Sequence, residues 1–407
     1  MPHRHAVILL SFIVVGVVLG TASGWFFGEA MLSVKWMGDL FLNALKMLII
    51  PLILAAVVSG VASLGDIRKL GRIGGITVGY YALSTGAAVL IGLIVVNVMQ
   101  PGAGMDWQQA GMAEGIAAKA EIGMEDILLS LVAPNLVAAA ADTQLLPLIL
   151  FAIVLSAALT TLGGTGEHVI KFFNGLNEAM MKVVIWLMYL APFGIFALIA
   201  GRLGQAGGGD AFGSEIRAVG LYVLTVLMGL GLHFLLLFVV LGVVARRGLP
   251  YLMNLGRALL TAFGTASSSA TLPLTMECAR EAGLDKRAVR FVLPLGSTVN
   301  MNGTALYEAV AAMFIAQAYG IDLTLWHQVI ILLTATLAAI GAAGIPEAGL
   351  VTMVIVLKAV GLPLEGIGLL LAVDWFLDRF RTAINVWGDA VGAAILHRFL
   401  PDALDDD

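Results

Sequence analysis

The chain is dominated by apolar stretches that are long enough to cross a lipid bilayer. An α-helix needs about 20 mostly apolar residues to span the hydrocarbon core. Because lipid offers backbone groups no hydrogen-bond partner, stretches of this length are expected to be helices. Eight uninterrupted stretches lie near residues 6–28, 40–63, 73–99, 126–160, 178–200, 218–245, 288–318 and 363–397. The sequence therefore predicts an all-α polytopic membrane protein with eight transmembrane helices.

Composition supports a lipid environment and excludes other classes. Of 407 residues, 60% are hydrophobic and 12% are charged, whereas soluble domains carry roughly 25% charged residues. The net charge of −5 comes without a block of basic residues, so a nucleic-acid partner is not expected. The single cysteine, Cys278, excludes an intrachain disulfide.

The basic residues predict how the chain is oriented. The first apolar stretch runs on to Phe27 without a clear small-residue cleavage site, so we interpret it as a retained helix. With the N-terminus inside, the main basic clusters all fall in cytoplasmic loops, as the positive-inside bias requires. These clusters are Arg68, Lys69 and Arg72; Arg246 and Arg247; and Lys286, Arg287 and Arg290.

Two further apolar segments, 256–278 and 328–358, are interrupted at their centres. The first contains the small-residue run from Gly264 to Pro273, and the second contains the run from Gly341 to Gly349. Such breaks survive in a membrane only where they are buried in protein or line a cavity. Paired broken segments point to the binding site of a transporter. We expect two re-entrant helical hairpins that enter from opposite sides, as in an inverted repeat with two gates.

The last apolar stretch carries a narrow polar stripe. Its members are Asp374, Asp378, Arg381, Asn385 and Asp389. Steps of four, three, four and four residues keep all five within roughly 80° of one helix face. Ionisable groups inside a membrane are costly and mark functional sites. The alternative is a buried structural ion-pair network.

The seventh stretch carries a polar interruption of its own. Asn300, Asn302 and Gly303 within apolar sequence indicate locally unwound helix, whose free carbonyl groups suit a cation such as sodium. An ordinary Asn-Gly turn is the alternative. Glu308 follows four residues after Thr304, and a carboxyl group removed from water can carry a proton. The alternative is a neutral, hydrogen-bonded acid.

Together these motifs resemble the glutamate transporter family, also called dicarboxylate/amino acid:cation symporters, which includes the excitatory amino acid transporters. The resemblance covers nearly the whole chain. It rests on Met47–Pro51, Ser267–Ser269, Asn300–Thr304, Ala343–Pro346 and Asp374–Asp389.

The resemblance implies a homotrimer that works by an elevator motion. Residues 1–72 and 126–217 would form the trimerisation scaffold. Residues 73–100 and 218–400 would form the mobile transport domain, with the second hairpin as the outer gate. The chain lacks the long extracellular insertion of the animal proteins, which fits a bacterial inner membrane.

The resemblance also implies roles in substrate binding. Arg381 would bind the side-chain carboxylate of the substrate, and Asp378 would bind its α-ammonium group. Asn385 and Thr304 would hold the α-carboxylate, while Asp374 would brace Arg381. The remaining pocket positions are Thr382 and the backbone of Ser268, Ile345 and Gly349.

Three sodium sites follow from the same resemblance. The first consists of Gly296, Asn300, Asn385 and Asp389. The second consists of backbone oxygens at Thr298, Ala339, Ile340 and Ala342. The third consists of Tyr81, Ser84, Thr85, Asn300 and Asn302.

Three positions depart from the family pattern or choose between its branches. The family usually has aspartate where this chain has Asn302, which weakens the third sodium site. The presence of Arg379 in the last span resembles the animal carriers. Together with Glu308 it implies a proton-carrying step and allows potassium counter-transport. Glu347 occupies the tip of the second hairpin, where it either alters gating or is simply solvated.

The leading hypothesis is sodium-driven uptake of acidic amino acids, L-glutamate or L-aspartate, with no enzymatic activity and no cofactor beyond the coupling ions. The nearest alternative is a proton-driven carrier of C4-dicarboxylates or of acidic amino acids, without sodium coupling. A C4-dicarboxylate has no ammonium group for Asp378, and a neutral amino acid would leave Arg381 unpaired. A channel or an intramembrane serine hydrolase is a further alternative, but no G-x-S-x-G elbow accompanies the serines of the first hairpin.

Overall fold

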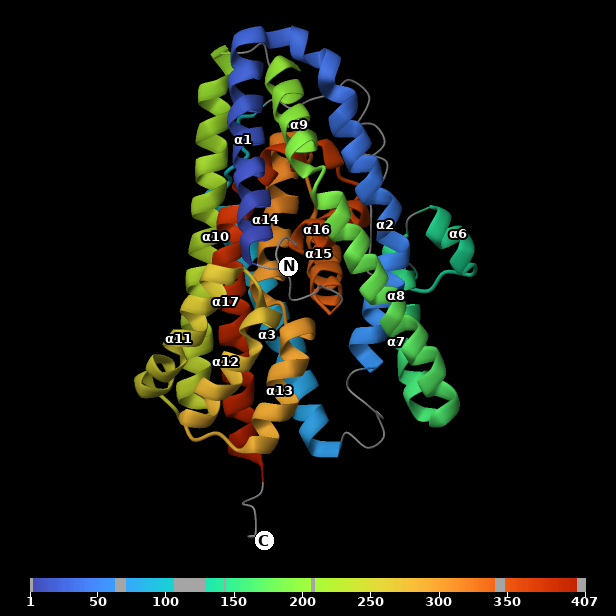
Figure 1. Ribbon diagram of the computed structural model, residues 1–407, viewed down its shortest axis with the longest axis vertical. Helices are drawn as coiled ribbons and strands as arrows, with labels where there is room; N and C mark the ends of the chain where they lie inside the picture. Colours follow the sequence, from blue (N-terminus) through green and yellow to red (C-terminus); the bar gives the residue numbers. More distant parts are fainter. Residues whose placement is uncertain are drawn as a thin grey trace.

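The computed structural model describes residues 3–62, 71–105, 129, 131–142, 144–205, 209–340 and 348–400, and its regular elements are helices (Figure 1). The first half contains α1 (His3–Phe27), η1 (Gly28–Val34), α2 (Lys35–Ala62), α3 (Gly71–Met99), α6 (Leu136–Ala141), α7 (Leu145–Thr161), α8 (Gly164–Met188) and α9 (Ala191–Gln205). The second half contains α10 (Gly209–Val243), α11 (Leu249–Thr265), α12 (Ser268–Glu281), α13 (Lys286–Val299), α14 (Asn302–Ala318), α15 (Leu325–Ala338), α16 (Ala348–Ala359), η2 (Leu364–Gly366) and α17 (Ile367–Phe399).

Several of these helices are long and apolar enough to cross a membrane. Three continuous stretches qualify within the described residues, namely Ser11–Ala44, Ile73–Met99 and Arg217–Val243. A bent pair, Gly164–Leu187 with Ala191–Gly201, makes a fourth. The chain is therefore a multi-pass helical membrane protein, while the count of eight spans stays a prediction.

The structure corrects the expected limits of the fifth span. We expected one span near 178–200, but α8 begins at Gly164 and the chain bends by 56° before α9. Polar residues in the first turns of α8, such as Glu167 and Lys171, hide this helix from an apolar-run criterion. Pro192, in the first turn of α9, has no backbone N–H to continue the preceding helix, which accounts for the bend.

A stripe of glycines on α1 packs directly against α9. A Cβ atom added to Gly16 would lie 2.5 Å from the Pro192 carbonyl oxygen, and one added to Gly20 would lie 2.8 Å from the Phe196 carbonyl oxygen. At Gly24 the nearest atom would be the Leu203 Cβ, at 2.7 Å. No side chain fits between the backbones, so the spacing of four residues sets the α1–α9 contact.

The two interrupted segments do fold as pairs of helices that contact each other, α11 with α12 and α15 with α16. In Figure 1 the first pair lies at the lower end of the molecule with the C-terminal end of α17, and the second pair lies higher. At the first break, Ala266 adopts a left-handed conformation (φ 49°) and Ser267 caps α12. The break between α15 and α16, residues 341–347, lies outside the described residues.

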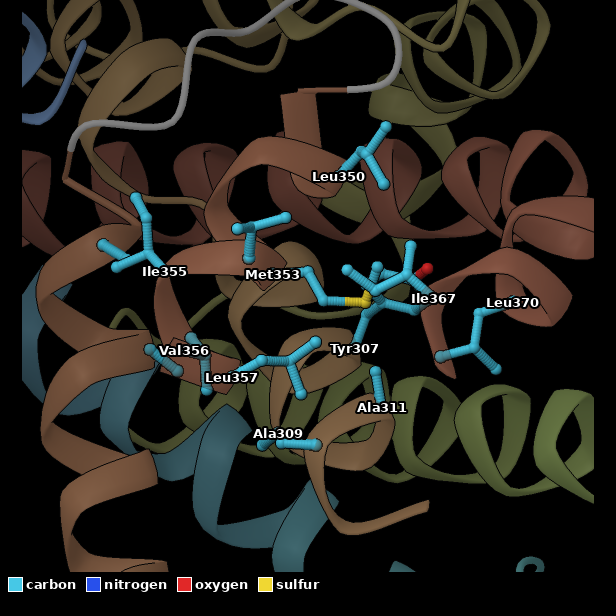
Figure 2. Packing of buried hydrophobic residues seen from close by; sticks show 14 of the residues in the cluster. Tyr307, Ala309, Ala311, Leu350, Met353, Ile355, Val356, Leu357, Ile367 and Leu370 are labelled. Carbon is cyan, nitrogen blue, oxygen red and sulfur yellow. The ribbon is translucent and has the colours of Figure 1, made fainter. Parts of the chain in front are cut away.

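The helix α14 lies at the centre of the fold. Sixteen of its 17 residues are buried, and α3, α10, α16 and α17 all contact it. Figure 2 shows the apolar side chains of α16 and α17 around it, with Met353 directed toward Tyr307 and Ile367. A helix buried on all sides has no lipid-facing stripe, so its polar residues face protein.

Candidate substrate and cation site

The polar stripe predicted on the last span is buried within the protein. All five of its members, Asp374, Asp378, Arg381, Asn385 and Asp389, lie on α17 and are at most 6% exposed. The outer face of α10, by contrast, carries exposed apolar side chains such as Leu235 and Val239. The stripe therefore faces the centre of the molecule, as ionisable residues in a membrane require.

Arg381 lies between two carboxylates. Its Nη1 is 2.9 Å from Asp374 Oδ1, and its Nη2 donates to Asp378 Oδ1 at 2.8 Å. Its Cζ lies 4.0 Å from the centre of the Tyr307 ring. The guanidinium is fully buried, and its Nε has no hydrogen-bond partner among the described residues. One arginine between two aspartates leaves the cluster with a net charge of −1 when all three are ionised.

The predicted interruption of the seventh span is confirmed. The helix α13 ends at Val299 and α14 begins at Asn302, so two residues lie outside either helix. The side chain of Asn385 on α17 compensates for the break, because its Oδ1 accepts a hydrogen bond from the Gly303 N–H at 2.8 Å. A helix start leaves such N–H groups without partners, so Asn385 serves as the cap that α14 itself lacks.

The predicted α-carboxylate ligands lie together. Asn385 Nδ2 donates to Thr304 Oγ1 at 3.3 Å. A Cβ atom added to Gly349 would lie 2.9 Å from Arg381 Nη1 and 3.3 Å from the Thr304 methyl carbon, so Gly349 brings α16 close to both residues. Thr382 is buried on α17 beside Arg381.

The residues of the first predicted sodium site are also adjacent. Asn300 Nδ2 donates to Asp389 Oδ1 at 2.9 Å. A Cβ atom at Gly296 would overlap the Asp389 carboxylate, so only glycine leaves room for that group. Asn385 lies one helical turn before Asp389 on α17.

The third predicted sodium site brings α3 against the same break. Thr85 Oγ1 donates to Asn302 Oδ1 at 2.7 Å, and the Ser84 and Thr85 hydroxyls lie 3.2 and 3.3 Å from Asn300 Oδ1. Tyr81 donates its hydroxyl to the Val292 carbonyl oxygen at 2.6 Å. Asn302 Nδ2 is buried and has no hydrogen-bond partner among the described residues, which is where the expected aspartate would differ from asparagine.

These groups fit a hard monovalent cation better than a transition metal. Their donors are carboxylate, amide, hydroxyl and backbone oxygens, the ligand types that hard cations prefer. Within the described residues no group of three or more His, Cys, Asp or Glu side chains could hold a metal ion. If sodium binds, Asp389 and Asn300 would hold it in one place, and Thr85 and Asn302 in the other.

Other predicted positions stay untested. Thr298 donates its hydroxyl to the Leu295 carbonyl oxygen at 3.1 Å, and Ala339 follows the last residue of α15 as its C-cap. The Ile340 carbonyl oxygen lies 2.9 Å from where a Gly60 Cβ would be. Ala342, Ile345 and Glu347 lie outside the described residues.

Glu308 lies one turn after Thr304, one of the predicted substrate-binding residues, and is fully buried on α14. The Thr352 hydroxyl of α16 and the Arg381 guanidinium both interact with its carboxyl group. A carboxyl group in this position lies between α16 and the residues predicted to bind substrate, and its role as a proton carrier stays a prediction.

Arg379 has a contact that the sequence does not predict. Its Nη1 donates to the carbonyl oxygens of Phe263 and Gly264, at 3.2 and 2.9 Å. These are among the last carbonyl groups of α11, which have no partner within the helix and carry its negative dipole end. Arg379 therefore ties α17 to the first hairpin, near its buried tip residue Ser268.

Sequence reasoning missed two further sets of residues. Tyr307, three residues after Thr304, stacks on Arg381, and that spacing could have suggested it. Tyr80 and Tyr251 donate their hydroxyls to the Gly388 and Ala390 carbonyl oxygens of α17, each at 2.7 Å. No sequence signal identifies those partners, because they are backbone atoms.

One charged contact lies outside the membrane segments, at the start of α13. Asp285 accepts a hydrogen bond from the Arg287 backbone N–H at 2.6 Å and pairs with the Arg287 guanidinium. The donated hydrogen bond from that side chain lowers the pKa of Asp285 below its ordinary value.

Comparison with known proteins gives a consistent result. The family model described as the sodium:dicarboxylate symporter family matches residues 9–399. An excitatory amino acid transporter of Caenorhabditis elegans is 38% identical over 98% of this chain and 89% of its own. Excitatory amino acid transporter 3 of Mus musculus is 39% identical over 95% and 83%. Neutral amino acid transporter A of Bos taurus is 36% identical over 99% and 84%.

Proposed function

This chain belongs to the sodium:dicarboxylate symporter family, and on that premise we propose that it couples the uptake of L-glutamate or L-aspartate to sodium. The observation that carries the proposal is the buried Arg381 guanidinium, placed between Asp374 and Asp378 and beside the Asn385–Thr304 pair. A cation of fixed charge in an apolar surrounding selects for an anionic partner.

We propose that substrate binding exchanges one ion pair for two. Before binding, Asp378 compensates Arg381 at 2.8 Å. An acidic amino acid brings a side-chain carboxylate for Arg381 and an ammonium group for Asp378, so both protein charges stay compensated. Asp374 holds the guanidinium throughout, at 2.9 Å from its Nη1. This exchange avoids an unpaired buried charge, whose cost is several kcal/mol.

The α-carboxylate would then meet Asn385 and Thr304. The Asn385 amide nitrogen and the Thr304 hydroxyl are both hydrogen-bond donors, and they lie 3.3 Å apart. The Gly349 backbone lies against Arg381 and Thr304, so α16 would cover the bound molecule. Thr382 and the backbone at Ser268 and Ile345 would complete the pocket.

Two other substrate classes fit the charges less well. A C4-dicarboxylate would place a second anion near Asp378, which is only 6% exposed. A neutral amino acid has no second carboxylate for Arg381. The relative named as a neutral amino acid transporter makes that second class worth testing directly.

We further propose sodium as the coupling ion and Glu308 as a proton carrier. Support for sodium comes from the oxygen atoms that Asp389, Asn300 and Thr85 bring together at the break between α13 and α14. Bound sodium would supply positive charge beside the substrate. The second predicted sodium site, formed by Thr298 and the second hairpin, would add to that charge. Glu308 and Arg379 together would also allow counter-transport of potassium.

The mechanical part of the proposal is an elevator motion in an inner-membrane homotrimer. The scaffold would comprise α1, α2 and the helices from α6 to α9, which pack mainly on one another. The transport domain would comprise α3, α10 and all later helices, which surround α14.

The test is uptake of labelled L-aspartate and L-glutamate into proteoliposomes, with sodium, proton and potassium gradients imposed one at a time. We expect uptake that requires external sodium, that increases when the external side is acidic, and that is competed by the other acidic amino acid. Uptake driven by protons alone, without sodium, would overturn the sodium assignment.

Arg381→Cys tests the pocket separately from the ions. We expect loss of acidic amino acid uptake and gain of uptake of small neutral amino acids, because the buried cation is replaced by a small neutral group. Arg398→Cys is the matched control on the same helix, at an exposed position. Undiminished aspartate uptake by Arg381→Cys would overturn the pocket assignment.

A further inference from the structure

A large apolar cavity lies between the two parts of the molecule, away from the polar site. Its volume is about 510 Å³, within the roughly 300–1,000 Å³ of typical ligand pockets. Its walls come from α1 and α9 on one side, including Val17 and Leu203, and from α10 and α17 on the other, including Val223 and Phe376.

The lining offers hydrocarbon and almost no hydrogen-bonding capacity. Apart from Thr21 and Trp375 the lining side chains are aliphatic, aromatic or glycine. The Trp375 indole N–H is already engaged, because it donates to the Ala372 carbonyl oxygen of its own helix at 3.1 Å. A polar solute would therefore lose its hydrogen bonds to water without replacement, whereas an alkyl chain would lose nothing.

The cavity opens toward the bilayer. Gly220 lines it, is exposed, and has no atom within 4 Å of the position of a Cβ. The neighbouring Leu224 on α10 is 52% exposed and Val18 on α1 is 59% exposed, as expected for lipid-facing positions. Both α1 and α10 contribute to stretches long and apolar enough to cross a membrane. The medium at the opening is therefore lipid hydrocarbon.

A cation lies at the level where a lipid head group would be. Arg217 is exposed on α10, three residues before Gly220 and therefore on the same side of the helix. It stands directly before the apolar stretch 218–245, at the edge of the hydrocarbon. An arginine at that depth suits a phosphate group.

We propose that this cavity binds one acyl chain of a phospholipid whose phosphate group contacts Arg217, and that the chain acts as a wedge between the α1–α9 pair and the α10–α17 pair. The binding site depends only on the membrane location of the protein. The wedge role rests on the transport function and elevator motion proposed above, because those two pairs would have to move past each other.

Photolabelling in proteoliposomes tests the binding site. The probe is phosphatidylglycerol with a diazirine near the end of one acyl chain, present as a minor component of phosphatidylcholine vesicles, and adducts are mapped by mass spectrometry. Ile199 and Leu203 line the cavity and are only 1% and 2% exposed, so a label on them reports a chain inside. Leu224 reports the surrounding lipid.

We expect adducts on the α9 peptide that carries Ile199 and Leu203 in addition to those at Leu224. Ala372→Phe on α17 and Val223→Phe on α10 should each fill the cavity and reduce the α9 adducts several-fold while leaving Leu224 labelled. Ala22→Phe is the matched control, because Ala22 is half-buried on α1 but does not line the cavity. Labelling of Leu224 without labelling of α9 in the unmodified protein would overturn the proposal.

Two further measurements separate the source and the role of the chain. A diazirine fatty acid added free should label α9 less than the phospholipid does; stronger labelling by the free acid would overturn the phospholipid assignment. Ala372→Phe should slow aspartate uptake while the apparent substrate affinity stays unchanged. Uptake at the unmodified rate in this variant would overturn the wedge role and leave the labelling result standing. Binding of the labelled lipid can be measured even if no substrate is transported.

Discussion

Two buried interfaces in this molecule, the α1–α9 contact and the polar face of α17, are held together by different kinds of atoms. Between α1 and α9 the closest atoms are backbone carbonyl groups and apolar carbons, which glycine exposes. On α17 Arg381 pairs with Asp374 and Asp378 of the same helix, while Asn385 bonds to α14 and Asp389 bonds to Asn300 at the end of α13.

The difference shows which interface can change its partners. Backbone packing at α1–α9 has one geometry, because any displacement along the helices brings side chains into the glycine positions. The α17 interface contains donors, such as Arg381 Nε on α17 and Asn302 Nδ2 on α14, without partners among the described residues. Natural structures keep few such groups, which supports the proposal that the second interface accepts a ligand.

The largest expected effect comes from removing one charge of the polar interface. Asp378→Asn should lower aspartate affinity by about 100-fold or more, because breaking a buried ion pair costs roughly 3–5 kcal/mol. Affinity for succinate, which has no ammonium group, should fall much less. The measurement is equilibrium binding of both ligands to purified protein, and equal losses for the two would contradict the ammonium role.

The next effect tests the backbone interface. Gly20→Leu should lower the free energy of unfolding by about 1–3 kcal/mol, the usual cost of overpacking, because the Phe196 carbonyl oxygen lies 2.8 Å from the Cβ position. Thermal unfolding in detergent measures it, with Ala22→Leu on the same helix as the control. Aspartate affinity of the folded fraction should stay unchanged; a fall in affinity equal to that of Asp378→Asn would erase the contrast between the interfaces.

A smaller effect tests the predicted cation site within the polar interface. Asn302→Asp should raise sodium affinity by about tenfold, because a charged acceptor strengthens a hydrogen bond or ion contact by roughly 1 kcal/mol or more. Thr85 would then donate to a carboxylate in place of an amide oxygen. Sodium dependence of aspartate binding measures it, with Asn97→Asp, at an exposed site on α3, as the control. Unchanged sodium dependence would remove Asn302 from the cation site.

The smallest effect lies where water screens the charges. The pKa of Asp285 is lowered by Arg287, so the pair stabilises the protein above the ordinary aspartate pKa, near 4, and this contribution is lost as pH falls through the lowered value. The contribution should be small because the pair is solvent-accessible. The free energy of unfolding should fall less on acidification in Asp285→Asn than in the unmodified protein. High salt should abolish this difference between the two proteins. A difference that persists in high salt would show a buried role.

The sequence predicted the polar interface far better than the apolar one. Charges within apolar sequence are rare, so the spacing of Asp374, Asp378 and Arg381 was enough to place them on one buried face. The break at Asn300 was predictable for the same reason. The spacing of Gly16, Gly20 and Gly24 was visible too, but it named no partner, since the contact is with backbone carbonyl groups of α9.

Other features depend on tertiary contacts that leave no local signal. The bend between α8 and α9 follows an amphipathic helix whose polar turns conceal its length. Arg379 was predicted as a feature shared with the animal carriers, and the bond of its guanidinium to carbonyl groups of α11 was not foreseen. Helix ends offer acceptors at any sequence, so an arginine that reaches one cannot be recognised without coordinates.

The glycine stripe also has a consequence for how the protein is made. The ribosome finishes α1 at residue 27 and begins α9 at residue 191, which at about 5–20 residues per second is a delay of roughly ten to thirty seconds. During this interval the grooved face of α1 has no protein partner, and lipid tails must fill it. Glycine, valine and leucine side chains are compatible with lipid, so α1 can stay in the bilayer during this interval. The lipid tails are displaced only when α9 packs against α1.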